Sequence, residues 1–421
     1  MYYRTTLANG LRIVGEVMPN VNSVAIGIWV GAGSRDEKSG MEGVSHLIEH
    51  MLFKGTARRS AREIAEAIDA VGGQLNAFTT REYTCFYVKI LDRHVALGLE
   101  LLSEMFCSSL FDPMELEKEK GVVIEEIKSY EDAPDEMVYD LLAAAWWPDH
   151  PLGRPILGTP SSVAGLTRGD ALAYMAEHYR PEETVLAVAG RFAFDEIVRL
   201  AEFHLSALTP SSAPVRRERP IPSPGRLVRA KDTEQVHLCL GGRGVERRNP
   251  EKFALLVMDS ILGGSVSSRL FQRLREDRGL VYAIGSTHAA FRDAGLLTIY
   301  AGTDPRNLSE VVGLILEEMG RLATEPVGEA ELARAKEQIR GNFLLGLEST
   351  SARMSRLAKA ELFYDRLLTP EEILALVDAV TAEDVQRAAR FSFGGVLPAA
   401  AVAPARLDLD LDRLLGEGVA V

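Results

Sequence analysis

The sequence predicts an α+β protein made of two structurally similar lobes, each an antiparallel-rich β-sheet packed with α-helices. Strand-like and helix-like segments come in blocks and lack the regular short alternation of a parallel βαβ fold. The second half of the chain weakly repeats the first at an offset of about 206–212 positions, and a proline-rich stretch lies at the midpoint. An internal duplication explains both observations.

The first half opens with a predicted edge hairpin, because Asn9-Gly10 tolerates a type I′ turn and apolar residues flank it. Alternating β-branched residues predict a strand over 23–30, and the glycines that follow separate it from a helical pattern over 44–53. The later elements are a helix over 64–71, strands over 75–91 and long helices over 113–147.

The proline-rich stretch PSSAPVRRERPIPSP at 210–224 cannot easily form a helix or a central strand. We therefore predict a first lobe over 1–212, a linker over 213–226 and a second lobe over 227–421. After the linker, VHLCLGGRGVERRN resembles VAIGIWVGAGSRDE of the first half, and a helix and a strand pair follow in both. The second lobe should repeat the first.

Composition and charge narrow the class of partner. Of 421 residues, 47% are hydrophobic and 25% are charged, which is typical of a soluble globular protein. With 47 Lys and Arg against 60 Asp and Glu, the net charge of −13 argues against a nucleic-acid partner. Basic peptides are more suitable partners for such a chain.

The compartment is expected to be the cytoplasm. The three cysteines have no CxxC spacing, so they indicate neither a disulfide framework nor a cysteine zinc site. No segment approaches the roughly 18–20 apolar residues of a membrane helix, and the first residues do not resemble a signal peptide. We expect a soluble protein without a membrane partner.

One short motif carries the chemistry. His46 and His50 in His-Leu-Ile-Glu-His lie one helical turn apart on one face, and Glu49 lies on that face too. Two imidazoles so placed can bind one Zn²⁺, and a carboxylate beside them can take a proton from the attacking water. This is the geometry of a metalloprotease, and we expect one zinc ion per chain.

A catalytic zinc site needs a third protein ligand, and the predicted helix over 115–130 offers several carboxylates. At 100° per residue, Glu119 and Glu126 share a face with Val122 and Val123, whereas Glu125 falls on the charged face. An inward carboxylate is costly unless it is paired or metal-bound. Glu126 is therefore the predicted ligand and Glu119 its supporting group, although an inward salt bridge with no catalytic role is an alternative for Glu119.

The motif H-x-x-E-H is the inverzincin signature, and 75 residues lie between His50 and Glu126. The chain thus resembles the pitrilysin/insulysin (insulinase) family of zinc peptidases, in particular its two-domain, mitochondrial-processing-peptidase-like bacterial branch. GVSHLIEHMLFKGT (43–56) and VVIEEIKSYEDAPD (122–135) carry the resemblance, which extends to about residue 400. It implies that His46, His50 and Glu126 hold the zinc, that Glu49 is the general base and that Glu119 supports the site.

The resemblance also implies substrate-binding residues. Asn76, Ala77 and Phe78 match the edge strand to which an extended substrate adds as a further strand, although an ordinary strand is the plain alternative. Arg275 and Tyr282 match an Arg and a Tyr that contact the substrate and can polarise the scissile carbonyl. From the sequence alone Arg275 would pass as a surface charge. The second lobe has no His at the ligand positions and should contact substrate without binding zinc.

The sequence therefore predicts a zinc endopeptidase that cleaves peptides or unfolded segments in a closed chamber. The resemblance implies that two chains form this chamber as a homodimer, with a heterodimer also possible, and that the partner supplies Arg275 and Tyr282. The competing hypothesis is a non-catalytic scaffold or partner subunit of a processing-peptidase-like complex. The complete motif argues against it. A non-proteolytic zinc hydrolase is the second alternative.

Overall fold

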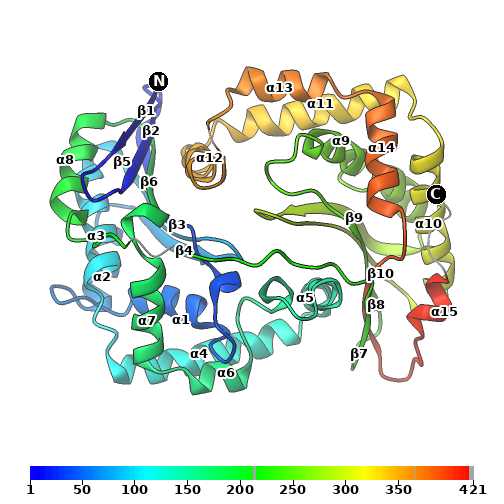
Figure 1. Ribbon diagram of the computed structural model, residues 1–421, viewed down its shortest axis with the longest axis horizontal. Coiled ribbons are helices and arrows are strands. Elements are labelled where there is room, and N and C mark those ends of the chain that lie inside the picture. The colour runs from blue at the N-terminus through cyan, green and yellow to red at the C-terminus, as the bar shows by residue number, and fades with distance from the viewer. Residues whose placement is uncertain (212–214, 365, 417–421) are drawn as a thin grey trace. The chain divides into compact units, whose positions relative to one another are not determined.

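The chain forms two α+β units in the computed structural model, which describes residues 1–211, 215–364 and 366–416 (Figure 1). The strands are β1 (Tyr2–Thr6), β2 (Arg12–Val17), β3 (Ser23–Val30), β4 (Gln74–Thr79), β5 (Thr84–Leu91), β6 (Thr184–Gly190), β7 (Arg226–Lys231), β8 (Val236–Arg243), β9 (Val281–Ala290), β10 (Gly295–Thr303) and β11 (Ala399–Pro404).

The helices before the midpoint are α1 (Val44–Leu52), α2 (Ala61–Asp69), α3 (Val95–Ser108), α4 (Pro113–Glu131), α5 (Pro134–Trp146), α6 (Pro160–Gly165), α7 (Arg168–His178) and α8 (Phe194–Leu205). Those after it are α9 (Lys252–Leu262), the π-helical turn η5 (Phe271–Glu276), α10 (Leu308–Thr324), α11 (Glu329–Gly346), α12 (Thr350–Phe363), α13 (Pro370–Asp378), α14 (Ala382–Phe393) and α15 (Leu411–Leu415).

Each unit contains one sheet, and the two sheets share one topology. The first has the strand order β1-β2-β6-β3-β5-β4 and the second β7-β11-β8-β10-β9. In each, one pair is parallel, β2 with β6 and β7 with β11, and the other pairs are antiparallel. Apart from the added β1, the second sheet repeats the first strand for strand. The predicted fold class and internal duplication are thus confirmed.

The boundaries of the two compact units differ from the single boundary that we predicted at 213–226. The first comprises 1–128, 154–217 and 345–367, and the second comprises 129–153, 218–344 and 368–421. Residues 215–225 of the predicted linker are neither helix nor strand, and Arg226 begins β7. Residues 212, 213 and 214 lie outside the described residues.

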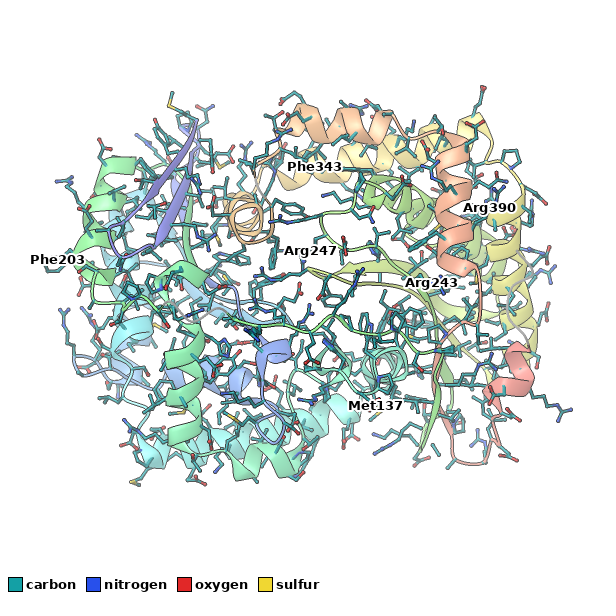
Figure 2. The ribbon with its side chains drawn as sticks, in the orientation of Figure 1. Met137, Phe203, Arg243, Arg247, Phe343 and Arg390 are labelled. Atoms are coloured by element: carbon teal, nitrogen blue, oxygen red, sulfur yellow. The ribbon has the colours of Figure 1, made fainter. Side chains whose placement is uncertain are left out.

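The difference arises because the halves exchange one helix each. In the first unit α12 packs on β2, β3 and β6, although it comes from the second half of the chain. In the second unit α5, from the first half, packs on β7, β8 and β11. Met137, labelled in Figure 2, lies on α5 in one apolar cluster with Leu142, Cys239 and Val402. Each exchanged helix covers one face of a sheet that would otherwise stay open.

In the first unit, the helices on the other face of the sheet position the site. Helix α1 contacts β4, β5 and α7, while α3 contacts β3 and β5. Val44, Leu47, Ile48 and Met51 of α1 are fully buried in this core. Among the described strands, β4 pairs only with β5 and lies at the edge of the sheet. The helix that carries the H-x-x-E-H motif therefore rests against an edge strand.

The predicted edge hairpin is present as β1 and β2, but its turn is not type I′. A type I′ turn needs positive φ at both central residues, and among the described non-glycine residues only Phe111 has one. Gly10 alone supplies positive φ, at +95°, and Leu7 and Leu11 close a longer loop through a 2.8 Å hydrogen bond from the Leu7 N–H to the Leu11 carbonyl. Asn9 instead accepts the Leu11 N–H with its side chain.

Candidate metal centre

Helix α1 starts at a tightly packed glycine and a buried carboxylate. Gly43 has φ +92°, and a Cβ there would lie 2.6 Å from the Leu157 carbonyl oxygen. The Glu37 carboxylate accepts the N–H groups of Gly43 and Ser45, both at 2.9 Å, and the Ser45 hydroxyl. It thus satisfies donors that the first turn of a helix leaves unpaired. Burial raises the pKa of Glu37 to about 7, although these hydrogen bonds oppose the shift.

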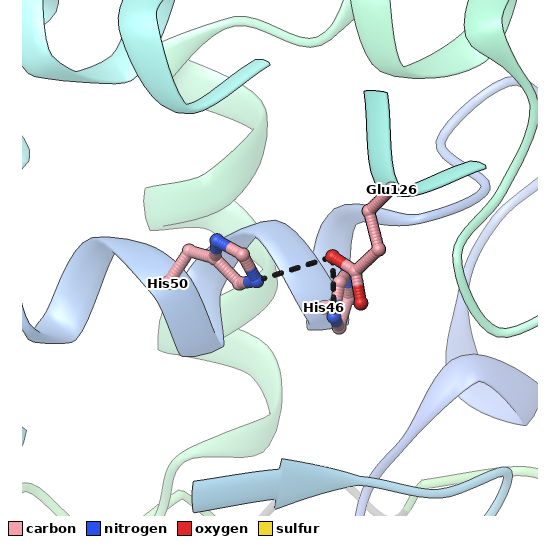
Figure 3. Close-up of side chains that lie close together, drawn as sticks. All are labelled: His46, His50 and Glu126. Carbon is pink, nitrogen blue, oxygen red and sulfur yellow. Dashed lines mark ion pairs between the residues drawn. The ribbon is translucent and has the colours of Figure 1, made fainter. Parts of the chain in front are cut away.

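The structure brings His46, His50 and Glu126 together on α1 and α4 (Figure 3). Glu126 Oε2 lies 3.8 Å from Nε2 of His46 and 3.6 Å from Nε2 of His50. One ligand atom from each residue lies within 4.8 Å of the others. Across the described ranges, 1–211, 215–364 and 366–416, this is the single group of three such side chains.

These three side chains fit a zinc ion. The two distances from Glu126 Oε2 to the histidine Nε2 atoms are longer than a hydrogen bond. The three ligand atoms therefore lie close together without a hydrogen bond between the carboxylate and either imidazole. Ligand atoms around tetrahedral zinc, with bonds of about 2.0 Å, lie about 3.3 Å apart. Two imidazole nitrogens and one carboxylate oxygen are also the donor set of many catalytic zinc sites. Burial lowers the pKa of His46 to about 4, which favours the neutral, ligating imidazole.

The face of α4 that points inward differs from the projection. Its buried residues are Leu116, Glu119, Lys120, Val123 and Ile127, whereas Val122 is exposed. The Glu126 side chain is 44% exposed and lies beside this face, not within it. Glu125 is also exposed and pairs with Lys128 at 2.6 Å. The burial argument for Glu126 was therefore wrong, although Glu126 is the carboxylate that meets the histidines.

Glu119 is buried, with a side chain 6% exposed, and it bridges two residues of α1 and its C-terminal turn. Its Oε2 accepts the Nδ1–H of His50 at 3.1 Å, and its Oε1 lies 2.7 Å from Nζ of Lys54. This contact places the proton of His50 on Nδ1 and leaves the Nε2 lone pair facing Glu126. His46 differs, because its buried Nδ1 finds no hydrogen-bond partner within the described part of the chain.

Glu49 lies beside His50 and is fixed by a hydroxyl of the edge strand. Thr79, the last residue of β4, donates its hydroxyl to Glu49 Oε2 at 2.5 Å. Burial raises the pKa of Glu49, and the hydrogen bond from Thr79 opposes this shift. A cavity of about 270 Å³ is lined by Glu49, His50, Phe53, Lys54, Asn76 and Glu119. Glu49, His50 and Asn76 of the edge strand therefore share one cleft.

The three predicted residues of β4 have different surroundings. Asn76 is exposed and lines the cleft, whereas Ala77 is buried in the core beneath α1. The Phe78 ring packs edge-on against Trp29, with ring centres 5.6 Å apart, in a cluster with residues of α12. Asn76 is thus the one whose side chain reaches the cleft, while the strand's outer edge stays unpaired among the described strands.

Arg275 and Tyr282 both belong to the second unit, whereas the metal centre lies entirely in the first. The Arg275 guanidinium lies over the Phe271 ring, 4.9 Å from its centre, on the π-helical turn. Tyr282 on β9 is 76% exposed and lines a cavity of about 520 Å³ together with Asp135, Glu136, Tyr139, Gln235, His237, Ala283 and Tyr300. Arg275 and Tyr282 thus belong to a different unit from His46, His50 and Glu126.

Two residues that contact the site, Thr79 and Lys54, were missed in the sequence, although simple periodicities point to both. In a strand, Thr79 lies on the same side as Ala77, and that side meets α1. Lys54 follows His50 by four positions, which is the spacing of neighbours on one helical face.

Two family models match the chain. The model described as "Insulinase (Peptidase family M16)" matches residues 12–160, and "Peptidase M16 inactive domain" matches residues 165–339. A Bacillus subtilis protein named as an uncharacterized zinc protease, YmxG, is 45% identical over 393 residues, which cover 93% of this chain and 96% of the relative. The chain belongs to the insulinase family of peptidases. A Streptomyces coelicolor member, also named as an uncharacterized zinc protease, is 40% identical over 93% of this chain and 87% of its own.

Solved structures share the fold of this insulinase-family chain. A protease from Helicobacter pylori superposes with a TM-score of 0.89 at 22% identity, covering 96% of this chain and 99% of the other. A chain of Complex III2 from Candida albicans gives 0.85 at 22% identity, covering 98% of each. No helix in the described ranges is both long and apolar enough to span a membrane.

Proposed function

We propose that this insulinase-family protein is a zinc-dependent endopeptidase that cleaves peptides or unfolded protein segments. The observation that carries the proposal is the convergence of His46, His50 and Glu126 on one point, with Glu49 on the same helix. The names of the relatives as zinc proteases support it. One zinc ion per chain is part of the proposal, since the described residues contain one such group.

His46, His50 and Glu126 would hold the ion, and His50 also lines the cleft that contains Glu49. When bound, zinc supplies a Lewis acid that polarises the scissile carbonyl and lowers the pKa of water. Glu119 keeps the Nδ1 proton on His50, so that Nε2 stays available as a ligand. The 44% exposure of the Glu126 side chain supports access for solvent and substrate.

Glu49 acts as the general base. Thr79 occupies Oε2 through its hydrogen bond, so Oε1 is the oxygen that takes a proton from the attacking water. The same carboxyl then donates this proton to the nitrogen of the leaving amine.

Substrate is proposed to bind as an added strand along β4. The strand lies at the sheet edge and pairs on one side with β5. Main-chain hydrogen bonds of this kind accept many sequences, so an extended or unfolded segment is the substrate class. Asn76 lines the same cleft as Glu49 and contributes a polar side chain beside the bound strand.

The proposal includes a homodimer that encloses a chamber, in which Arg275 and Tyr282 of one chain contact the substrate of the other. Its support is the resemblance of 274–282 to the family segment, together with the 76% exposure of Tyr282. A tyrosine exposed on a strand beside a 520 Å³ cavity is suited to contact a peptide.

Glu49→Gln tests the reaction. The variant should bind zinc as the wild type does and lose peptide hydrolysis by a factor of about 10²–10⁴, because it removes the proton acceptor. Cleavage of a mixed peptide library, with and without a chelator, and zinc content measured on the same samples check both parts. Glu125→Gln is the matched control, since Glu125 is an exposed carboxylate paired with Lys128.

Several outcomes would contradict the proposal. Peptide cleavage by zinc-loaded Glu49→Gln at the wild-type rate would exclude Glu49 as the base. A wild-type protein that binds zinc but cleaves no unstructured peptide would favour a non-proteolytic hydrolase. A wild-type protein that neither binds zinc nor cleaves peptides would favour the scaffold or partner-subunit hypothesis.

A further inference from the structure

We propose that Lys54 is a positioning residue of the metal centre: it holds Glu119 in the orientation that presents His50 to the metal. This inference rests on the metal-binding part of the proposed function. Three successive contacts, which lead from Lys54 to Glu126, support the inference. Lys54 Nζ lies 2.7 Å from Glu119 Oε1, Glu119 Oε2 lies 3.1 Å from His50 Nδ1, and His50 Nε2 lies 3.6 Å from Glu126 Oε2.

The chain places Lys54 on the side of α1 that carries the ligands. His46, His50 and Lys54 follow one another at intervals of four residues. The helix ends at Leu52, and the Lys54 N–H continues the turn by bonding the Met51 carbonyl at 3.1 Å. Gly55, with φ +108°, then turns the chain away. Lys54 also lines the cleft with Glu49, His50 and Glu119.

Glu119 depends on this cation. Its side chain is 6% exposed, and an isolated buried carboxylate costs several kcal/mol unless each oxygen is paired. Lys54 and His50 pair one oxygen each. Without Lys54, Oε1 loses this partner and the carboxylate turns toward water. His50 then loses the acceptor that fixes its ring and raises its basicity as a ligand.

A plainer role for Lys54 is that of a cation near the C-terminus of a helix, where positive charge is favourable by itself. The two roles predict opposite changes in metal affinity. If Lys54 acted only through its charge, its loss would strengthen the binding of a nearby cation. If it positions Glu119, its loss weakens zinc binding, as expected for partners of metal-ligating histidines.

The test measures zinc binding and does not depend on proteolysis. The full-length chain is freed of metal and titrated with Zn²⁺ in competition with a chromophoric chelator. Lys54→Met should bind zinc about 10- to 100-fold more weakly, and Lys54→Arg, which keeps a cation within reach of Glu119, should restore most of the affinity. Lys128→Met is the control, because it removes a lysine whose partner is the exposed Glu125.

A double-mutant cycle tests whether Lys54 affects zinc binding through Glu119. If Lys54 acts through Glu119, Lys54→Met should have little further effect on zinc affinity in the Glu119→Gln background. Additive effects of the two substitutions, or wild-type or stronger affinity in Lys54→Met, would overturn the inference. Circular dichroism of the metal-free variants checks folding, and Lys54→Arg keeps the test decisive should Lys54→Met not fold.

The titration also separates this inference from the proposed function. A wild-type chain that takes up no zinc would refute the metal centre and the role of Lys54 together. A wild-type chain that binds zinc, with Lys54→Met binding equally, would refute the positioning role alone.

Discussion

Thr79 links the proposed general base to the strand that we propose receives substrate. Its hydroxyl is 2.5 Å from Glu49 Oε2, and its backbone belongs to β4. A peptide that pairs with β4 is therefore aligned on the same element that orients the base. In the proposed mechanism, this hydroxyl couples substrate position to proton transfer.

We expect Thr79→Val to lower kcat about 10- to 100-fold with little change in KM, because a hydrogen bond to a charged group contributes about 1.5–3 kcal/mol. The valine keeps the shape of the side chain but removes the donor. Steady-state kinetics on an unstructured peptide measure the effect, and Thr79→Ser should recover most of kcat. An unchanged kcat in Thr79→Val would contradict this role.

The second unit offers a matched control for Thr79. There Ser286 of β9 donates its hydroxyl to Asp259 Oδ1 of α9, also at 2.5 Å. The same kind of bond thus joins a helix to an edge strand in the unit that lacks His46, His50 and Glu126. Ser286→Ala should change stability but leave kcat close to the wild-type value.

At the scale of elements, the N-terminus of α1 has a pH-sensitive support in Glu37. Its pKa is about 7 in the folded chain and about 4.3 in an unfolded one. A raised pKa means that the folded chain holds the proton more tightly. The stability that this contributes is fully present below about pH 4.3 and is lost as the pH rises through about 7.

In the wild type, Glu37 should make the free energy of unfolding fall by roughly 3 kcal/mol between about pH 4.3 and 7. Glu37→Gln should remove this fall. Urea unfolding of both proteins across this range gives the difference curve. The comparison is needed because burial lowers the pKa of His46 and His288, each to about 4. These two histidines make the free energy of unfolding rise with pH, which is opposite to the effect of Glu37. Parallel curves for wild type and variant would contradict the prediction.

The sequence was sufficient to predict the elements around the H-x-x-E-H motif and their repeat after the linker, but not the surface that each one covers. Strand β3 was predicted with its observed bounds, since alternation specifies a half-buried strand. Helical periodicity can also show which side of α5 and of α12 is apolar. It does not show which sheet that side packs against. For the same reason Val122 was assigned to the buried side of α4 but is 49% exposed.

The candidate site was predictable where one short segment holds its parts. His46, Glu49 and His50 lie within one and a half helical turns, so helix geometry alone relates them. Glu126 and Glu119 were predicted from the helical projection of 115–130 and then from the family resemblance, but the contact between α1 and α4 that brings them to the histidines cannot be derived from the periodicity of one helix. Periodicity places Thr79 and Lys54 on the sides that meet the site, but many other residues share such positions, and only the contacts with Glu49 and Glu119 single these two out.

Helix α12 should control the stability of the sheet that carries the metal centre. Leu357 is 1% exposed and packs with Trp29 and Val185, which lie on β3 and β6. Leu357→Ala should destabilise the protein by about 2–5 kcal/mol. Hydrogen exchange should show the loss of protection in β3 and β6, more than 150 residues away in sequence. Leu345→Ala, at a position 67% exposed, is the control.

Confinement of the effect of Leu357→Ala to strands of the second half would contradict this packing. So would equal effects of the two substitutions. Chemical denaturation gives the free energies, and exchange measured by peptide gives the location.

At the scale of the whole molecule, the proposed homodimer can be tested through its active sites. One chain carries Glu49→Gln and the other Arg275→Ala, and the two are co-expressed. If Arg275 acts on the partner's substrate, the mixed dimer contains one complete site and recovers activity that neither variant has alone. If it acts within its own chain, mixing recovers nothing.

Sedimentation velocity of the wild type checks the assembly itself, with a mass of two chains expected at micromolar concentration. A single chain at tens of micromolar would contradict the homodimer. It would also direct the search to a different partner chain.

The exchange of α5 and α12 sets an order of events during synthesis. The proposed ligands and base are complete once residue 126 has been made, but the helix that closes their sheet extends to Phe363 of 421 residues. During synthesis, one face of the first sheet therefore stays uncovered until most of the chain has emerged from the ribosome. Premature termination yields a fragment that has every proposed catalytic side chain and no finished core. The fold thereby delays the maturation of the metal centre until nearly all of the protein exists.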